Sequence, residues 1–376
     1  MSKDRKSGTP KRLTAGMSRR KFVALTGAGA AIAASTPFIP KKVFAASMTK
    51  VKLTLGWLPQ GTSSWTYAAL PYWKKAGIDV SIEKGSGSAL AVQQIGQGQY
   101  EFGIPAAPNA IQQAIKGLPL MTLMTMSYDT SMGIAILADG PIKSLKDLEG
   151  KKVGSTLTSG EYPFLQAFYK NAGVDPSKIE SVAVDNKVRE RSLLDGLVSA
   201  ISCFGTSAVP PILAAGGKPK VFLYSKYGLP LYGNSLLTAP AFFEKEKSLC
   251  EAMTIGMCEG VKSTFLDPAK TIDTMFNAVP EFKMASSARE QAEIGLGLWA
   301  ALSTVPEQME QSIGYSDPAK YKLMNDTIFE SASAGSDKKP DPTSLMTNEF
   351  VGSVKMTADE WAEVKKRFGT YAAYVS

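Results

Sequence analysis

The chain has 376 residues, enough for one large domain or two medium ones with a substantial apolar core. Its composition, 44% hydrophobic and 20% charged, is that of a globular protein rather than a disordered or membrane-spanning one. It contains no histidine, which excludes Ser-His and Cys-His nucleophile pairs and the commonest metal ligand. Three cysteines are too few for a four-cysteine zinc site or a disulfide scaffold, and we expect neither metal nor cofactor.

The net charge of +8 lies almost entirely in the first 45 residues. That segment holds ten Lys or Arg residues against one Asp, a net charge of +9, so the rest of the chain carries −1. A nearly neutral body lacks the basic surface that nucleic-acid binding requires, and no nucleic-acid partner is expected.

Residues 1–45 have the features of a removable export signal. The string SRRKFV at 18–23 matches the core of the twin-arginine consensus and precedes a modest apolar run at 22–39. Glycine, serine and proline dilute that run, whereas a membrane span needs roughly 20 strongly apolar residues. Cleavage is expected near Ala45/Ala46, which would leave the mature protein free in the periplasm. An ordinary secretory signal with a chance arginine pair is the alternative.

The cysteines do not form an obvious disulfide set. Cys250 and Cys258 lie eight positions apart in a helical pattern, so about 12 Å of helix rise separates them. A disulfide needs Cα atoms within roughly 7 Å. We expect Cys203, Cys250 and Cys258 to be small buried apolar residues.

From residue 51 onward, short β-rich runs alternate with helical patterns, which is typical of an α/β fold with mainly parallel strands. The first unit is expected to have strands at 51–55, 78–82, 100–104, 120–126 and 133–138, and helices at 65–76, 89–97 and 108–117. After a turn at 139–141, a short capped helix at 144–150 precedes strands at 152–155, 181–184, 200–204 and 220–224, with helices at 162–172 and 188–196. A strand at 233–238 then leads into an almost wholly helical C-terminal part.

This order predicts two α/β lobes, one of them interrupted by the other. The first lobe would comprise residues 46–139 and 236–376, and the second would comprise 140–235. Two chain crossings between the lobes would form a hinge, and the cleft between lobes is the expected ligand site.

Ligands in open α/β sheets bind beyond the carboxyl ends of strands, so the loops there are candidate contacts. After the first strand, Trp57 offers a planar face for stacking, and Ser63 or Ser64 can cap the next helix; Trp57 could equally cover core leucines. In the run GSGS at 85–88, Ser86 and Ser88 stand beside glycines that let backbone N–H groups approach a ligand. Similar turns join many strands to helices without binding anything.

Two further loops complete the candidate site. Ser159, Gly160 and Glu161 follow a strand in the second lobe; Glu161 would either favour ligand N–H groups or only stabilise the helix N-terminus. Phe204 follows another strand, and Tyr227 lies near the return crossing. Arg189 and Arg191 are the only nearby guanidinium groups, and we expect them to be solvated helix residues.

Several of these segments resemble one family of substrate-binding proteins of ABC importers, the branch for nitrate, sulfonate, taurine and thiamine-pyrimidine precursors. The resemblance rests on SLKDLEGKKVG at 144–154, GIDV at 77–80 with the GSGS run, NAGVDPSKI at 171–179, and YG…YGN at 227–234. It implies a type II periplasmic binding fold, two lobes that close on a small solute. Glu101 and Ser199 depart from the family pattern, which usually has Asp at both places.

The resemblance implies a monomeric solute receptor, without enzymatic activity, that delivers a small organic solute to an ABC permease and ATPase complex. It would meet the membrane only through the permease. Because the candidate loops hold hydroxyls, aromatics and Glu161 with almost no Lys or Arg, a pyrimidine-like or aromatic solute is favoured over a sulfonate, taurine or nitrate. The alternatives are a ligand sensor for a membrane signalling partner and an enzyme using Glu161 or Cys203. The pyrimidine-forming relatives consume a histidine of their own chain, which this chain lacks.

Overall fold

The computed structural model describes residues 48–284, 286–332 and 338–375. The predicted export signal and the cleavage site near Ala45/Ala46 lie outside the described residues. Residues 46–376 form one compact unit. Among the described helices, none combines the length and the apolar content needed to cross a bilayer.

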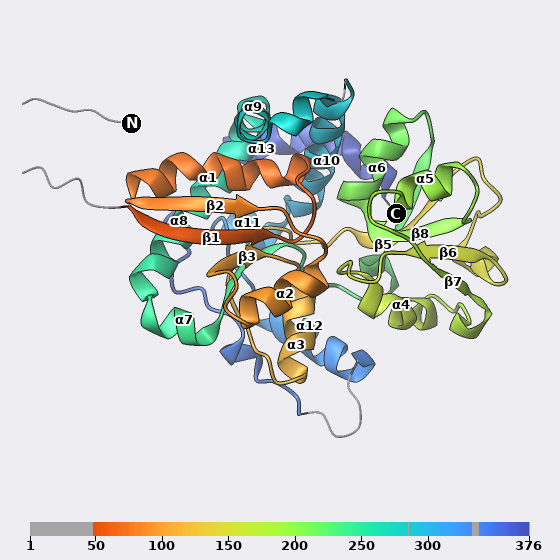
Figure 1. The fold of residues 1–376 in the computed structure, drawn as a ribbon, viewed down its shortest axis with the longest axis horizontal. Coiled ribbons are helices and arrows are strands. Elements are labelled where there is room, and N and C mark those ends of the chain that lie inside the picture. Colours follow the sequence, from red (N-terminus) through yellow and green to blue (C-terminus); the bar gives the residue numbers. More distant parts are fainter. Residues whose placement is uncertain (1–47, 285, 333–337, 376) are drawn as a thin grey trace, which may run out of the picture. The chain divides into compact units, whose positions relative to one another are not determined.

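The strands form two separate five-stranded sheets, each with helices packed beside it (Figure 1). In order across the first sheet, the strands are β2 (Ile78–Glu83), β1 (Thr49–Leu55), β3 (Phe102–Ile104), β10 (Ser235–Thr238) and β4 (Met121–Thr125). In order across the second sheet, they are β7 (Glu180–Ala183), β6 (Lys152–Ser155), β8 (Ala200–Phe204), β5 (Met132–Leu137) and β9 (Pro219–Leu223). We call the two sheets with their helices the first and second lobes. The predicted α/β class is confirmed.

Six α-helices that precede β10 in the described part of the chain are interspersed with these strands. They are α1 (Ser64–Lys75), α2 (Ser88–Gly96), α3 (Ala107–Ile115), α4 (Leu165–Asn171), α5 (Arg189–Leu194) and α6 (Gly205–Ala214). The C-terminal part is helical, as predicted, and contains α7 (Pro240–Lys245), α8 (Lys247–Leu266), α9 (Pro268–Ala278), α10 (Ala288–Ser303), α11 (Pro306–Glu310), α12 (Pro318–Ala332) and α13 (Ala358–Phe368).

The sheets are mixed rather than mainly parallel, which corrects the sequence-based expectation. In the first lobe β1 is parallel to β2 and β3, but β10 is antiparallel to β3 and β4. In the second lobe β6 is parallel to β7 and β8, whereas β5 is antiparallel to β8 and β9. The antiparallel strands β5 and β10 are the first strands after each crossing between the lobes. The local sequence does not indicate whether such a strand runs parallel or antiparallel to its neighbours.

The strand at 132–137 belongs to the second sheet, although the sequence places it before the predicted boundary at 139/140. Its run MGIAIL is apolar throughout and buried almost to its end, so either sheet could accept it. Pairing with β8 and β9 puts the first crossing between Thr125 and Met132, ahead of the turn at 139–141.

The two crossings between the lobes run side by side and are hydrogen-bonded to each other. The N–H of Gly233 donates to the carbonyl oxygen of Ser127 at 2.7 Å, and the N–H of Thr130 donates to that of Leu231 at 3.1 Å. The rings of Tyr128 and Tyr232 meet edge to face, 5.9 Å apart. These contacts couple the crossings, as a hinge requires.

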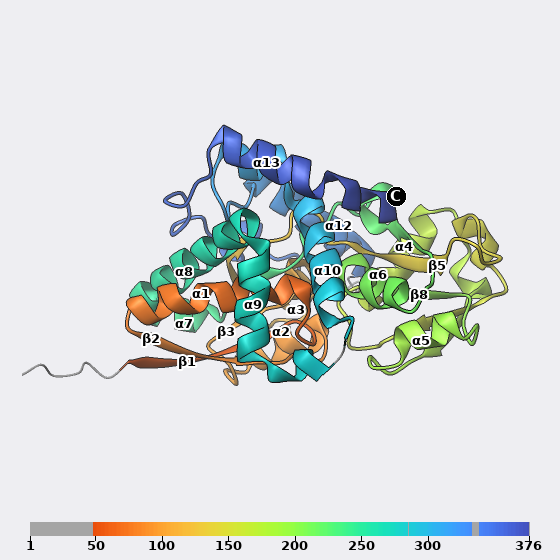
Figure 2. The same ribbon diagram turned by 90° about the horizontal axis from the view of Figure 1, so that it is seen from above.

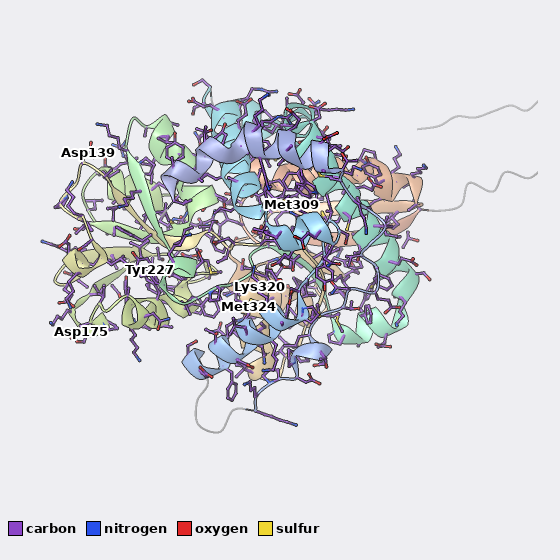
Figure 3. All side chains as sticks on the ribbon, turned by 180° about the vertical axis from the view of Figure 1, so that it is seen from behind. Asp139, Asp175, Tyr227, Met309, Lys320 and Met324 are labelled. Atoms are coloured by element: carbon purple, nitrogen blue, oxygen red, sulfur yellow. The ribbon has the colours of Figure 1, made fainter. Side chains whose placement is uncertain are left out.

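Residues of α12 and its neighbours brace the crossings. Lys320, one turn from Met324 on α12 (Figure 3), donates to the carbonyl oxygen of Tyr128 at 2.8 Å, and its Nζ lies 4.3 Å from the ring centroid of Tyr232. The Tyr232 hydroxyl accepts from the N–H of Asp317 at 3.0 Å and donates to Glu307. The crossings are therefore tied to the helical C-terminal part as well as to each other.

Part of the C-terminal segment packs on the second lobe. Helix α10 lies against α6 (Figure 2), and Leu298 joins the apolar cluster formed around Ile201 and Val209. Val375 pairs with Val221 of β9 in an isolated bridge. The segment 236–376, expected in the first lobe, thus contributes to both.

Candidate functional site

The loop after β1 brings Trp57 to the cleft between the lobes, where it is half-buried. Ser63 and Ser64 are buried, but the predicted capping of α1 is wrong, since no side-chain bond caps that helix. Instead the Ser63 hydroxyl accepts from the N–H of Gln60 at 3.1 Å and closes the short helical turn at Gly61–Ser63. A serine hydroxyl can bond to any nearby backbone group. Because a short helical turn precedes α1, Ser63 bonds within that turn instead of capping α1.

The run at 85–88 lies directly opposite the second lobe. The Thr158 hydroxyl donates to the carbonyl oxygen of Ser86 at 2.7 Å, so this loop is bonded across the cleft. Gly87 has φ +131°, and a Cβ there would overlap the carbonyl oxygen of Thr158. The buried hydroxyl of Ser88 accepts from the N–H of Ala106 at 3.1 Å. Gly87 thus allows close approach of the other lobe's backbone, whereas Gly85 allows close approach of Leu55 in its own lobe.

Ser159 and Glu161 are fully buried within the second lobe. The Glu161 carboxylate accepts from the Ser202 hydroxyl of β8 at 3.0 Å and from the Ser159 hydroxyl. Glu161 is therefore turned toward β8 rather than toward the cleft. Gly160, between them, receives a hydrogen bond on its carbonyl oxygen from Asn109 Nδ2 of α3 at 3.1 Å.

Four of the predicted residues meet at one small cavity between the lobes. It has a volume of about 20 Å³ and is lined by Gly56, Trp57, Gln60, Ser88, Gly160, Phe204, Ser207 and Asn234. A cavity of that volume holds one water molecule rather than a solute. The lobes therefore touch here in a closed arrangement.

The remaining predicted residues lie elsewhere. Ser86 lines a neighbouring cavity of about 480 Å³ with Leu58, Thr158 and Asn186. Tyr227 packs edge to face on Phe168, with ring centroids 5.4 Å apart, in the second lobe (Figure 3). Ser63, Ser64, Ser159, Glu161 and Tyr227 do not line the small cavity.

A larger cavity of about 420 Å³ adjoins the small one and shares Trp57, Gln60 and Ser207 with it. Its other walls come from both lobes, with Arg189, Glu190 and Pro211 on one side and Phe282 and Gln291 on the other. Arg189 is only 1% exposed, so its expected place as a solvated helix residue is wrong. Arg191 fulfils that expectation, with its side chain 70% exposed and paired with Asp195 at 2.7 Å.

Arg189 is buried because distant segments cover it. Its Cζ lies 5.1 Å from the ring centroid of Trp57, and its Nη2 donates to the Ser207 hydroxyl of α6 at 3.1 Å. In the sequence, only its position in the segment that follows a strand could have singled it out. Asn109 and Asn234 also face the cleft region. Asn109 carried no sequence signal, and Asn234 stood in the YGN motif at 232–234 without being singled out as a ligand contact.

Burial keeps two side chains behind the cleft, Cys203 and Tyr224, in their neutral forms. It raises the pKa of the Cys203 thiol well above its usual range, and it does the same to the phenol of Tyr224. Cys203, Cys250 and Cys258 are all free and buried, as predicted. Within the described residues, no three Asp, Glu or Cys side chains gather in a way that could hold a metal ion.

Comparison with known proteins places this architecture in a family. The profile of the NMT1/THI5-like family matches residues 65–271, more than half of the chain and most of both sheets. The chain belongs to the NMT1/THI5-like family.

Among curated relatives of this NMT1/THI5-like protein, a putative thiamine biosynthesis protein from Haemophilus influenzae is 25% identical over 50% of this chain and 61% of its own length. A 4-amino-5-hydroxymethyl-2-methylpyrimidine phosphate synthase from Legionella pneumophila is 23% identical over 41% of this chain and 49% of its own. A formylaminopyrimidine-binding protein from Halalkalibacterium halodurans is 21% identical over 71% of this chain and 80% of its own length. The chain thus spans less than two thirds of the first two relatives.

Solved structures agree on the fold. The periplasmic aliphatic sulphonate binding protein SsuA from Escherichia coli matches with a TM-score of 0.59 at 15% identity, covering 80% of this chain and 97% of that one. The periplasmic nitrate-binding protein NrtA from Synechocystis PCC 6803 matches with a TM-score of 0.58 at 11% identity, covering 88% and 91%. The NMT1/THI5-like chain therefore has the periplasmic binding protein fold, as predicted.

Proposed function

We propose that this protein is an extracytoplasmic solute receptor that captures a small organic molecule between its lobes and delivers it to an ABC permease and ATPase complex. The observation that carries the proposal is the interlobe cavity of about 420 Å³, in which Trp57 of one lobe faces Arg189 of the other. Cavities of this volume suit ring-sized ligands. The names of the solute-binding relatives and neighbours support a transported solute.

The paired crossings support a closing motion as the working step. A ligand that contacts both lobes only when they are closed shifts the population toward the closed state. The proposal includes the twin-arginine export signal, cleavage near Ala45/Ala46, a periplasmic location, a monomeric state, and lobes divided at the crossing between Thr125 and Met132 and again near 235/236. The proposed solute is a pyrimidine-like or aromatic compound, with the sulfonate, taurine and nitrate group as the alternative.

The test is a thermal-shift screen of the exported protein against pyrimidines, sulfonates and aromatic acids, followed by small-angle scattering. A ligand at 100 times its dissociation constant should add roughly 2.7 kcal/mol to the free energy of unfolding. The ligand that stabilises the protein should also change its scattering curve if the free protein samples an open state. A screen without any stabilising compound, together with invariant scattering, would contradict the proposal.

A synthase activity is the second candidate, because two relatives carry the name of a pyrimidine phosphate synthase. It would need a reactive group in the cleft. Glu161 is bound by hydroxyl groups away from it, and burial keeps the Cys203 thiol protonated. Mass spectrometry separates the two candidates: a receptor releases its ligand unchanged, whereas a synthase alters the ligand or its own chain.

Sensing rather than transport is a third possibility for the same binding step. The neighbouring genes distinguish transport from sensing. Adjacent permease and ATPase genes favour transport, and an adjacent sensor-kinase gene favours signalling.

A further inference from the structure

Arg189, one of the residues that line this cavity, has an unpaired hydrogen-bond donor. Arg189 Nε donates to Glu190 Oε1 at 2.8 Å, and Nη2 bonds to the same oxygen and to the Ser207 hydroxyl. Nη1 is buried and has no hydrogen-bond partner among the described residues. A buried donor without a partner is costly, and more so on a charged group, so an acceptor from a bound molecule would satisfy a need that the protein leaves open.

The lining charges favour an anionic acceptor. Two cations, Lys187 and Arg189, line the cavity against one carboxylate, Glu190, whose Oε1 is already held by the guanidinium. Behind this layer, the Glu161 carboxylate is bonded to Ser159 and Ser202, and the Cys203 thiol is protonated because burial raises its pKa.

The first turn of α6 contributes to the same wall. Thr206 and Ser207 line the cavity, and α6 begins one residue earlier, at Gly205. The N-terminal end of this ten-residue helix supplies partial positive charge. It adds to the field of the buried guanidinium and points to the same kind of ligand group.

Another part of the cavity lining is flat and apolar. The half-buried indole of Trp57, with Pro59 beside it, comes from the first lobe, as does Phe282, while Pro210 and Pro211 come from the second. Such a surface accepts the face of a planar ring. Trp57 and Arg189 belong to different lobes, so a molecule that touches both requires the closed arrangement.

We propose that the cleft binds a flat ring carrying an anionic oxygen group, a carboxylate or a sulfonate, and that Arg189 is the residue that determines this specificity. This inference rests on the proposed function and narrows it. It replaces the neutral solute that the sequence analysis favoured by an anionic one, because the sequence analysis placed Arg189 in solvent, outside the site. Nη1 and the N-terminal end of α6 would hold the anionic oxygens, and Trp57 would stack on the ring.

The test uses matched acid and amide probes on the exported protein. Benzoate is compared with benzamide, nicotinate with nicotinamide, and benzenesulfonate with benzenesulfonamide, by isothermal titration at low salt. We expect the acid of at least one pair to bind at least tenfold more tightly than its amide, and the acid's affinity to fall as salt is added. The carboxylate and sulfonate arms show which anionic group is preferred.

Arg189→Gln should abolish the preference for the acid, and Arg191→Gln should retain it. Arg191 is the matched control because it lies on the same helix but is exposed and paired with Asp195. If Arg189→Gln does not fold, Arg189→Lys keeps the positive charge but replaces the three nitrogens of the guanidinium by one ammonium nitrogen, and the acid preference should fall but remain.

Three outcomes would overturn the inference. Equal or tighter binding of every amide, or an acid preference that survives Arg189→Gln, removes the role of Arg189 and leaves the proposed receptor function intact. Failure of all six probes to bind the wild-type protein also overturns it, and the receptor function is then decided by the wider pyrimidine and sulfonate screen.

Discussion

Asn109 of α3 donates a hydrogen bond from Nδ2 to the carbonyl oxygen of Gly160, 3.1 Å away in the other lobe. Asn109 is 1% exposed, and its Oδ1 has no partner among the described residues. This bond and the one from Thr158 to Ser86 join the lobes directly across the cleft. Both are available only when the lobes are closed, so they bear on the balance between open and closed states.

Removing the Asn109 bond should favour the open state. Asn109→Ala is expected to weaken binding of any cleft ligand by up to about tenfold, since a hydrogen bond contributes about 1 kcal/mol net. Titration of a ligand found in the screen measures this change, and scattering of the free protein measures the opening. The control is Asn171→Ala, since Asn171 is exposed at the end of α4. Equal affinities for the two variants would contradict the prediction.

Gly87 should be essential for closure. Gly87→Ala places a methyl group against the carbonyl oxygen of Thr158 across the cleft, so the closed state should be lost and ligand affinity should fall at least tenfold. The control is Gly352→Ala, because Gly352 has a similar φ of +121° with nothing within 4 Å of a Cβ. Both variants carry backbone strain of order 1 kcal/mol, measured by denaturant unfolding. A ligand affinity of Gly87→Ala that matches the control would disprove the steric role.

Glu149 should give the second lobe a stability that is lost in acid. The side chain of Lys146, the N–H of Asp175 and the side chain of Lys178 bond to its carboxylate and lower the pKa of Glu149 to about 2. A lowered pKa means that the contribution is complete above the unfolded-state value near 4.5 and disappears as the pH falls toward 2.

Glu149→Gln should therefore lower the thermal midpoint at pH 7 and converge with the wild type near pH 2. Calorimetry between pH 7 and pH 2 measures the difference. Glu180→Gln is the control, since Glu180 is 60% exposed and only 3.6 Å from Lys152. A constant difference between Glu149→Gln and wild type over the whole range would show that the carboxylate charge is not responsible.

The cysteines should be unreactive in the native protein. Cys203, Cys250 and Cys258 are buried, and burial raises their pKa values, that of Cys250 to about 12, so the reactive thiolate is scarce. Ellman's reagent at pH 8 should label none of them within minutes and all three after denaturation. Rapid labelling of one thiol in the native protein would mean that its segment opens locally.

Features that depend on neighbouring residues were predictable from the sequence. The SLKDLEG run specified a capped turn, and in the structure Ser144 and Asp147 form a reciprocal capping box on the short helix Leu145–Leu148. The rule that ligands bind beyond strand ends selected Trp57, Ser88, Gly160 and Phe204 as candidates, and these four residues line one cavity in the structure. Each of these depends on a residue's own position in a strand, turn or helix.

Features that depend on distant partners were not predictable. Arg189 looked like an exposed helix residue, and only Trp57 and Ser207, contributed by other loops, make it a buried cation. Glu161 looked available to a ligand, but a hydrogen bond from Ser202 of β8, 41 residues away in the sequence, turns it inward. The strand at 132–137 could have joined either sheet, because an apolar run does not indicate which strands it pairs with.

By itself, the amino-acid order determined the α/β class, the helical C-terminal part, the candidate loops and the burial of the cysteines, because periodicity and turn chemistry act over a few residues. The tertiary structure alone decided which sheet holds each crossing strand, that the lobes meet at Asn109 and Gly160, and that a guanidinium faces an indole across the cleft. Those outcomes depend on which surfaces pack together once the chain has crossed twice, and side chains far apart in the sequence determine that packing.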